Sequence, residues 1–118
     1  MIYLYYSERF QGYNFGPEHP FNPARLMLTF SLMEESGLID ERVCRLEPCP
    51  AGEEDILRVH TPEYLEAVRL EEPDLAFGLG SDDTPVFGGI YEASRMLAGA
   101  SIDAARRIAA EDCSAFNI

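Results

Sequence analysis

The sequence predicts an α/β fold of three layers built around a mainly parallel sheet. Short runs of β-branched and aromatic residues alternate with longer segments whose apolar residues recur every three or four positions. The 118 residues, 47% of them apolar and 25% charged, suffice for one domain with a single core. No segment reaches the roughly 18 uninterrupted apolar residues that a membrane helix requires.

The N-terminal half is expected to contain two strands and one helix. Residues 2–6 form a short aromatic and β-branched run that is typical of a buried strand. Residues 7–21 are rich in glycine, proline, asparagine and aromatic side chains, which predicts a long loop, and such loops are usually functional. Residues 22–37 begin with Asn-Pro and end with glycine, which predicts an amphipathic helix. Residues 42–46 are predicted to form the second strand.

The C-terminal half is expected to contain three helices and a last strand. Residues 53–59 predict a short helix, and the Thr61-Pro62 pair predicts the start of another. Residues 71–85 have the composition of a loop. Apolar and small residues step by three and four along residues 87–110, which predicts a long helix packed closely on a sheet. Residues 114–118 predict a strand, and open α/β sheets place their active sites at the carboxyl ends of strands.

Charge and cysteine content argue against several classes of function. Nine basic and 21 acidic residues give a net charge of −12, which opposes binding to nucleic acid and to anionic membranes. Solubility is the simplest explanation of this acidity, and steering of a basic substrate is the alternative. Three cysteines without a secretory leader indicate a reduced, cytoplasmic setting.

Two short segments combine polar side chains with rigid turns. His19 and Arg25 flank a loop-to-helix junction that contains two prolines; alternatively, the prolines only set the turn and Arg25 lies on the surface. Asp82 and Asp83 precede Pro85 and a predicted helix. These two carboxylates either serve a binding role or cap that helix. A metal site would need histidine or further carboxylate partners that are not nearby in the sequence. For each segment, the residues by themselves leave both the functional role and the structural alternative open.

Four segments resemble the signature blocks of the histone deacetylase and acetoin-utilisation deacetylase family, in the family's order. They are His19-Pro-Phe-Asn-Pro-Ala-Arg25, Glu54-Asp-Ile-Leu-Arg-Val-His60-Thr-Pro-Glu-Tyr-Leu65, Gly80-Ser-Asp-Asp-Thr-Pro-Val-Phe-Gly-Gly-Ile-Tyr-Glu92 and Ala115-Phe-Asn-Ile118. The resemblance spans nearly the whole chain. It implies an arginase-like α/β fold and hydrolysis of an N-acetyl amide, such as acetyl-lysine or an acetylated polyamine.

The resemblance also implies a zinc ion in the intact family enzyme, held by an Asp-x-His pair and a further aspartate. A histidine pair that moves protons follows, in the family, directly after the strand that here reaches Ile118. This sequence contains neither His-His nor Asp-x-His. Residues 1–118 are therefore expected to be an incomplete, N-terminal portion of a deacetylase domain, which has no metal or cofactor of its own and is inactive alone.

The residues to which the resemblance gives a role in this chain are expected around the reaction centre and not in it. Asp83 matches a rim aspartate that accepts hydrogen bonds from the substrate backbone, and Asp82 takes that role if the register slips by one. Arg25 matches an arginine that lines an internal channel for released acetate, and its charge suits a small carboxylate. Tyr6 and His19 are expected near that channel.

Two functions of different classes remain open. The first is a fragment of a deacetylase whose intact form acts on an acetylated small molecule or an acetyl-lysine peptide. The second is a non-catalytic interaction or assembly domain derived from the same fold. Because unpaired strand edges invite association, the expected partner is another copy of the chain or a complementary C-terminal chain. Nucleic acid and membranes are not expected as partners.

Overall fold

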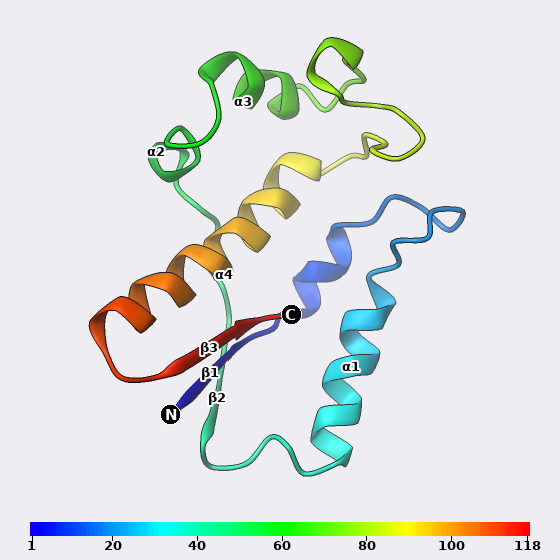
Figure 1. The fold of residues 1–118 in the computed structure, drawn as a ribbon. Coiled ribbons are helices and arrows are strands. Elements are labelled where there is room, and N and C mark those ends of the chain that lie inside the picture. Colours follow the sequence, from blue (N-terminus) through cyan, green and yellow to red (C-terminus); the bar gives the residue numbers. More distant parts are fainter.

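A three-stranded parallel sheet lies at the centre of the molecule (Figure 1). The computed structural model describes all of residues 1–118, with strands β1 (Ile2–Tyr5), β2 (Val43–Leu46) and β3 (Ser114–Asn117) in the order β2-β1-β3. The register pairs Tyr5 with Leu46 on one side and with Asn117 on the other, so the three strands end at the same edge. The predicted α/β class with a parallel sheet is confirmed.

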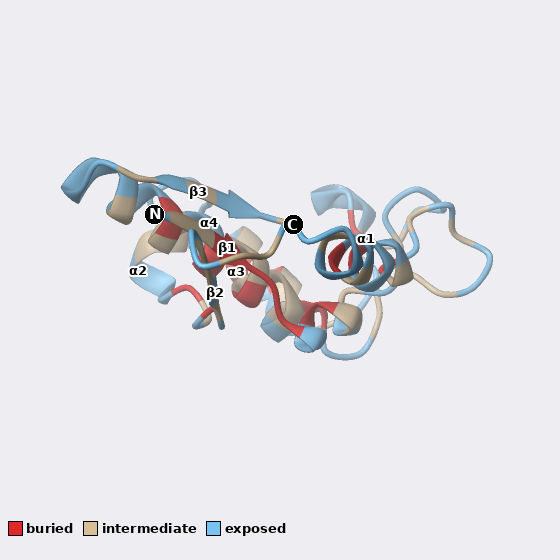
Figure 2. Ribbon diagram, turned by 90° about the horizontal axis from the view of Figure 1, so that it is seen from below, coloured by how far each residue is buried: buried red, intermediate tan, exposed pale blue.

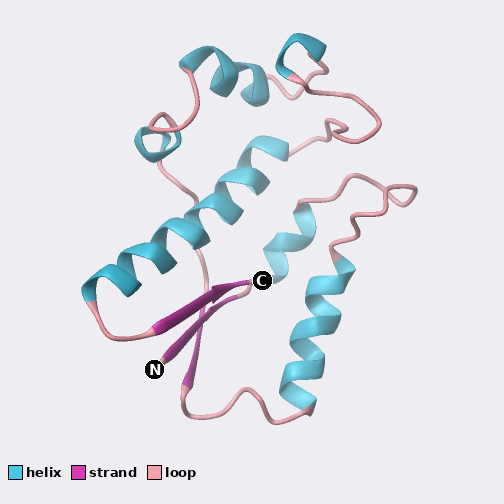
Figure 3. Cartoon of the chain, viewed as in Figure 1, coloured by secondary structure: helices cyan, strands magenta, loops and turns pink.

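Helices cover both faces of this sheet, and the successive side chains of Tyr5 and Tyr6 each contact a different one. The Tyr5 hydroxyl donates a hydrogen bond to Asp103 of α4 (Ile90–Ala110) on one face. On the other face the Tyr6 ring stacks on Phe30 of α1 (Ala24–Glu35), with ring centroids 4.3 Å apart. The strands lie between these two helices in Figure 3, and the layers are therefore α1, the sheet and α4.

The core follows β1 and the two helices that cover it, as the buried residues in Figure 2 show. Ala100 is fully buried, and small residues on this side of α4 let the helix approach the sheet closely. Gly99 has a related role: a Cβ there would clash with the carbonyl oxygen of Cys49 and lie 2.8 Å from the amide nitrogen of Ala51. The buried cluster comprises Leu4, Tyr5, Tyr6, Phe10, Leu26, Phe30, Met96, Ala100 and Ala104.

The remaining elements are two short α-helices and two 3-10 helices. They are the helices α2 (Glu53–Ile56) and α3 (Pro62–Arg69) and the 3-10 helices η1 (Glu8–Gly12) and η2 (Leu75–Phe77), both of which form in segments predicted to be loops. The predicted start of α3 is correct, since the Thr61 side chain accepts a hydrogen bond from the Tyr64 amide. The long helix begins at Ile90 rather than at residue 87, because Gly89 adopts a left-handed φ of 87°.

None of the helices has both the length and the apolar character needed to cross a membrane.

Candidate functional site

A groove of about 630 Å³ opens at the carboxyl edge of the sheet, where β3 ends between η1, α1 and α4. Its walls combine apolar side chains with a few polar groups. Phe10, Phe21 and Leu97 supply apolar wall, and Arg25 and Asn117 bring charge and an amide. This position fits the expectation that the functional edge of a parallel sheet is the one where its strands end.

Arg25 enters the groove from the first turn of α1. The start of this helix is fixed by two hydrogen bonds: Gln11 donates to the Pro23 carbonyl at 2.8 Å, and the Ala24 amide donates to the Asn22 side chain at 2.9 Å. The Arg25 guanidinium lies 4.5 Å from the centroid of the Phe21 ring, a cation–π contact.

Arg25 is also exposed and takes part in none of the molecule's ion pairs. Arginines elsewhere in the chain do pair with carboxylates: Arg69 binds Glu53 of α2 and Glu66 of its own helix, and Arg95 binds Glu92 of its own helix. A guanidinium that has an aromatic support but no carboxylate partner retains its donors for a small anion.

Asn117 fastens the carboxyl end of β3 to α4. Its side-chain amide donates to the Leu97 carbonyl at 3.1 Å and to the Ser101 hydroxyl at 2.9 Å. The sequence analysis did not single out Asn117 as a functional residue; the available signal was one polar residue near the end of an otherwise apolar strand. These two hydrogen bonds hold the carboxyl end of β3 against α4.

Tyr6 lies outside the groove. It is only 3% exposed, stacks on Phe30, and has the Arg45 guanidinium 5.1 Å from its ring centroid. Burial raises the pKa of Tyr6 above its ordinary value. The structure therefore does not bring Tyr6 together with Arg25 in the groove walls, and a role for Tyr6 in a channel stays a prediction.

His19 bridges two loops rather than facing the groove. Its Nδ1 accepts a hydrogen bond from the Phe21 amide at 3.0 Å, and its Nε2 lies 3.1 Å from the backbone carbonyl oxygen of Asp83. The half-buried imidazole therefore connects the loop before α1 with the loop that carries the two aspartates. The two segments that sequence analysis selected separately are neighbours in the structure.

Asp82 and Asp83 are exposed at the tip of the loop of residues 78–85, which we call the acidic loop. They do not cap α4, so helix capping is the wrong explanation for this pair. That role belongs to Glu71, whose carboxylate accepts hydrogen bonds from the amides of Gly89 at 2.9 Å and Tyr91 at 3.4 Å. Glu71 has a φ of 55°, which is unusual for a residue other than glycine.

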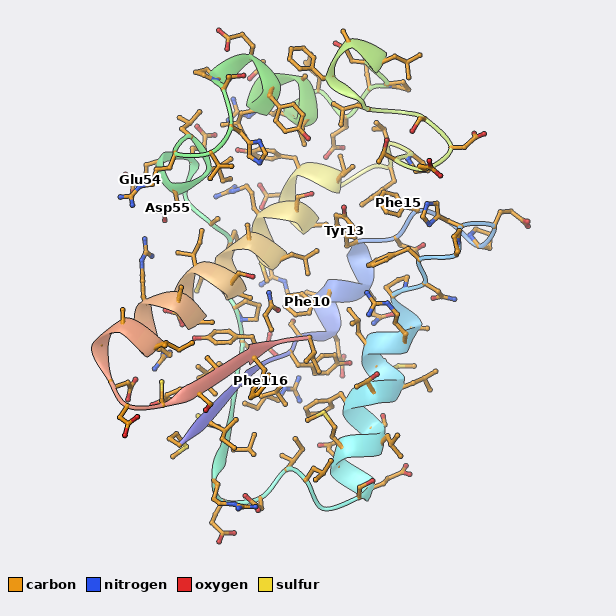
Figure 4. The ribbon with its side chains drawn as sticks, in the orientation of Figure 1. Phe10, Tyr13, Phe15, Glu54, Asp55 and Phe116 are labelled. Carbon is orange, nitrogen blue, oxygen red and sulfur yellow. The ribbon has the colours of Figure 1, made fainter.

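An aromatic cluster joins the groove to the acidic loop. It consists of Tyr13, Phe15, Phe21 and Phe87, whose rings pack edge to face; the centroids of Tyr13 and Phe15 each lie 5.6 Å from that of Phe87. Figure 4 labels Tyr13 and Phe15, which lie on the segment between η1 and α1. Sequence analysis did not assign this cluster; its signal was the aromatic content of residues 7–21.

The site does not fit a resident metal ion. No group of three or more histidine, cysteine, aspartate or glutamate side chains is arranged to hold one. The His19 imidazole contacts the backbone carbonyl of Asp83 rather than its carboxylate, and both of its ring nitrogens already face backbone groups. A zinc ion therefore finds no ligand set in residues 1–118.

Comparison with known proteins identifies relatives along most of the chain. The histone deacetylase domain model matches residues 19–118. The acetoin utilization protein AcuC of Bacillus subtilis is 39% identical over 107 residues, which cover 85% of this chain and 27% of AcuC. Histone deacetylase clr6 of Schizosaccharomyces pombe is 35% identical over 116 residues, which cover 91% of this chain and 28% of clr6.

The fold has a counterpart among solved structures. The crystal structure of an HDAC homolog from Aquifex aeolicus superposes with a TM-score of 0.83 and 24% identity, covering 98% of this chain and 33% of the homolog. The chain thus spans no more than about a third of the length of the relatives it matches.

Proposed function

Because the chain belongs to the histone deacetylase domain family, we propose that it forms the N-terminal part of a deacetylase that hydrolyses N-acetyl amides. The proposed substrate is an acetyl-lysine peptide or an acetylated small molecule of the polyamine type. The main support is the arrangement at the carboxyl edge of the sheet, where the groove with Arg25 and the acidic loop with Asp83 are joined by the aromatic cluster.

In this proposal the two charged residues act on different parts of the substrate. Hydrolysis adds water across the amide bond and yields an amine and acetate. Asp83 accepts hydrogen bonds from the backbone N–H groups of a peptide substrate, for which its exposed position at a loop tip is suitable. Arg25 receives the acetate, for which a guanidinium without a carboxylate partner beside an apolar groove is suitable.

The zinc ion that the family resemblance implies is not assigned to this chain, because its residues offer no ligand set. The contribution proposed for residues 1–118 is therefore the scaffold and the substrate rim.

The test is release of acetate from an acetyl-lysine peptide and from an N-acetylated polyamine by the complete deacetylase, and by residues 1–118 alone with added Zn²⁺. Hydrolysis by the complete protein and none by the chain alone is the expected result. The proposal fails if the complete protein cleaves neither substrate, or if the chain alone shows metal-dependent hydrolysis.

A second candidate function is assembly through the sheet edge. β3 is an edge strand, and its Phe116 is 55% exposed, which is unusual for a large apolar residue in the central sheet of an α/β fold. The partner in that case is a second copy of the chain or a complementary C-terminal chain. Sedimentation of residues 1–118 separates the candidates: a tight oligomer that Phe116→Glu dissociates favours assembly, whereas a monomer counts against it.

A further inference from the structure

We propose that His19 is a positioning residue that holds the acidic loop and thereby orients Asp83 toward the substrate. This inference rests on the proposed substrate role of Asp83, and it gives His19 a task other than the channel role expected from the sequence. His19 forms a bridge between the loop before α1 and the acidic loop.

The acidic loop is closed on itself around its tip. The Thr84 hydroxyl donates to the Gly78 carbonyl at 2.7 Å and lies 2.8 Å from the Ser81 hydroxyl. The Gly80 amide donates to the Thr84 carbonyl at 2.8 Å. These bonds shape the loop but leave its tip without support from the rest of the molecule.

The contact with His19 supplies that support. Among the hydrogen bonds of Ser81, Asp82 and Asp83, the one to His19 alone reaches beyond the acidic loop. Because all three residues are exposed, burial does not restrain them. The orientation of the Asp83 peptide group therefore depends on one imidazole.

The geometry also fixes the tautomer of that imidazole. Nδ1 accepts the hydrogen bond of the Phe21 amide, so the proton of the neutral ring lies on Nε2, which then donates to the Asp83 carbonyl. The ring is packed against Phe15, with centroids 4.6 Å apart, and Phe15 contacts Phe87 in turn. The donor is thus held in place before any substrate binds, which lowers the entropy lost on binding.

Two substitutions test separately the hydrogen bonds made by the two ring nitrogens of His19. His19→Asn keeps an acceptor near the position of Nδ1 for the Phe21 amide but is too short to reach the Asp83 carbonyl. His19→Gln keeps a donor near the position of Nε2 but loses the acceptor. If His19 acts through Asp83, His19→Asn is the damaging change and His19→Gln restores function, although both remove the imidazole.

The first measurement is hydrogen exchange of the segment that covers residues 78–86 in the complete deacetylase. We expect exchange to accelerate about fivefold in His19→Asn and to stay near the wild-type rate in His19→Gln. This readout does not depend on enzymatic activity, so it tests the bridge even if the proposed function is wrong. Unchanged exchange in His19→Asn overturns the inference.

The second measurement is a double-mutant cycle on KM for an acetyl-lysine peptide, with His19→Asn and Asp83→Asn alone and combined. We expect His19→Asn to raise KM about fivefold with little change in kcat, and to add nothing once Asp83 is replaced. If His19 only supports the fold in general, the KM increases of the two single variants would instead multiply in the double variant. Independent effects in the cycle therefore contradict the positioning role.

Discussion

The β1–α4 interface and the acidic loop are held in place by opposite means. At the interface, side chains such as Tyr5 and Ala100 are at most 1% exposed, and packing and hydrogen bonds act together. The acidic loop is paired with Asp74 at its start, through Leu79, but its exposed tip is connected to the rest of the molecule by the His19 bridge. The difference predicts that changes at the interface reduce stability, whereas changes in the loop reduce substrate binding and leave the fold intact.

A part-buried polar network links β1 to α4. The Tyr5 hydroxyl donates to Asp103 and accepts a hydrogen bond from Arg107 at 2.9 Å, while the Arg107 guanidinium lies 4.6 Å from the centroid of the Tyr3 ring. Burial, and then the hydrogen bond to Asp103, raise the pKa of Tyr5 to about 12. The same hydrogen bond holds the pKa of Asp103 below its ordinary value.

The largest effect is expected for Gly99→Ala. The added Cβ would clash with the Cys49 carbonyl and meet the Ala51 amide at 2.8 Å, so α4 must move away from this segment. We expect a loss of about 3 kcal/mol in the free energy of unfolding, the upper end of typical overpacking costs, measured by urea denaturation.

The matched control for Gly99→Ala is Gly88→Ala, which adds the same methyl group where no atom lies within 4 Å. We expect its free energy of unfolding to stay within about 1 kcal/mol of wild type. Equal losses for the two variants would show that the close approach of α4 to Cys49 and Ala51 is not the cause of the lost stability.

A smaller effect is expected for Tyr5→Phe. The substitution removes the hydroxyl that links Asp103 and Arg107 and leaves the ring in place. We expect a loss of about 1–2 kcal/mol in urea denaturation, because part-buried hydrogen bonds to two charged groups are lost. A loss below about 0.3 kcal/mol would contradict a stabilising role for the network.

Tyr5 also predicts a pH dependence. Its pKa is about 12 in the folded chain and close to 10 when unfolded, so between these values the unfolded state releases the proton first. The stabilising contribution is complete below pH 10 and is lost as the pH rises toward 12. The wild type should therefore lose stability more steeply than Tyr5→Phe over this range, and parallel curves would exclude Tyr5 as the source.

The smallest effect is expected for Arg25→Ala. Removing this solvent-exposed charge should weaken the inhibition of the complete deacetylase by added acetate about threefold. The free energy of such a change lies in the usual range for exposed ion pairs. Arg9→Ala is the control, because Arg9 is also exposed and forms no ion pair but lies outside the groove walls. Equal inhibition of all three proteins would remove Arg25 from the acetate site.

The sequence predicted those parts of the fold that depend on a strong local pattern of residues. The alternation of strands and helices, the Thr61 cap and the long apolar stripe of α4 all led to elements that the structure contains. The 3-10 helix η1 was missed because the loop composition of residues 7–21 concealed a local cap, the Ser7 side chain that accepts a hydrogen bond from the Arg9 amide.

The site was predictable only in part, because its contacts join segments that are far apart in the sequence. Family resemblance led to Arg25 and Asp83, but no local pattern indicates that His19 bonds to a residue 64 positions away. For the same reason Glu71 was not recognised as the cap of α4, and the aspartates nearer the helix were considered instead.

The proposed function makes the acidic loop of this chain the substrate rim of a deacetylase. Its most direct test is the KM of the complete enzyme for an acetyl-lysine peptide in Asp83→Asn and in Asp82→Asn. We predict that KM rises about tenfold in Asp83→Asn, equivalent to the loss of about 1.4 kcal/mol of binding, and stays near the wild-type value in Asp82→Asn. An unchanged KM in Asp83→Asn, with hydrolysis otherwise intact, would contradict the claim.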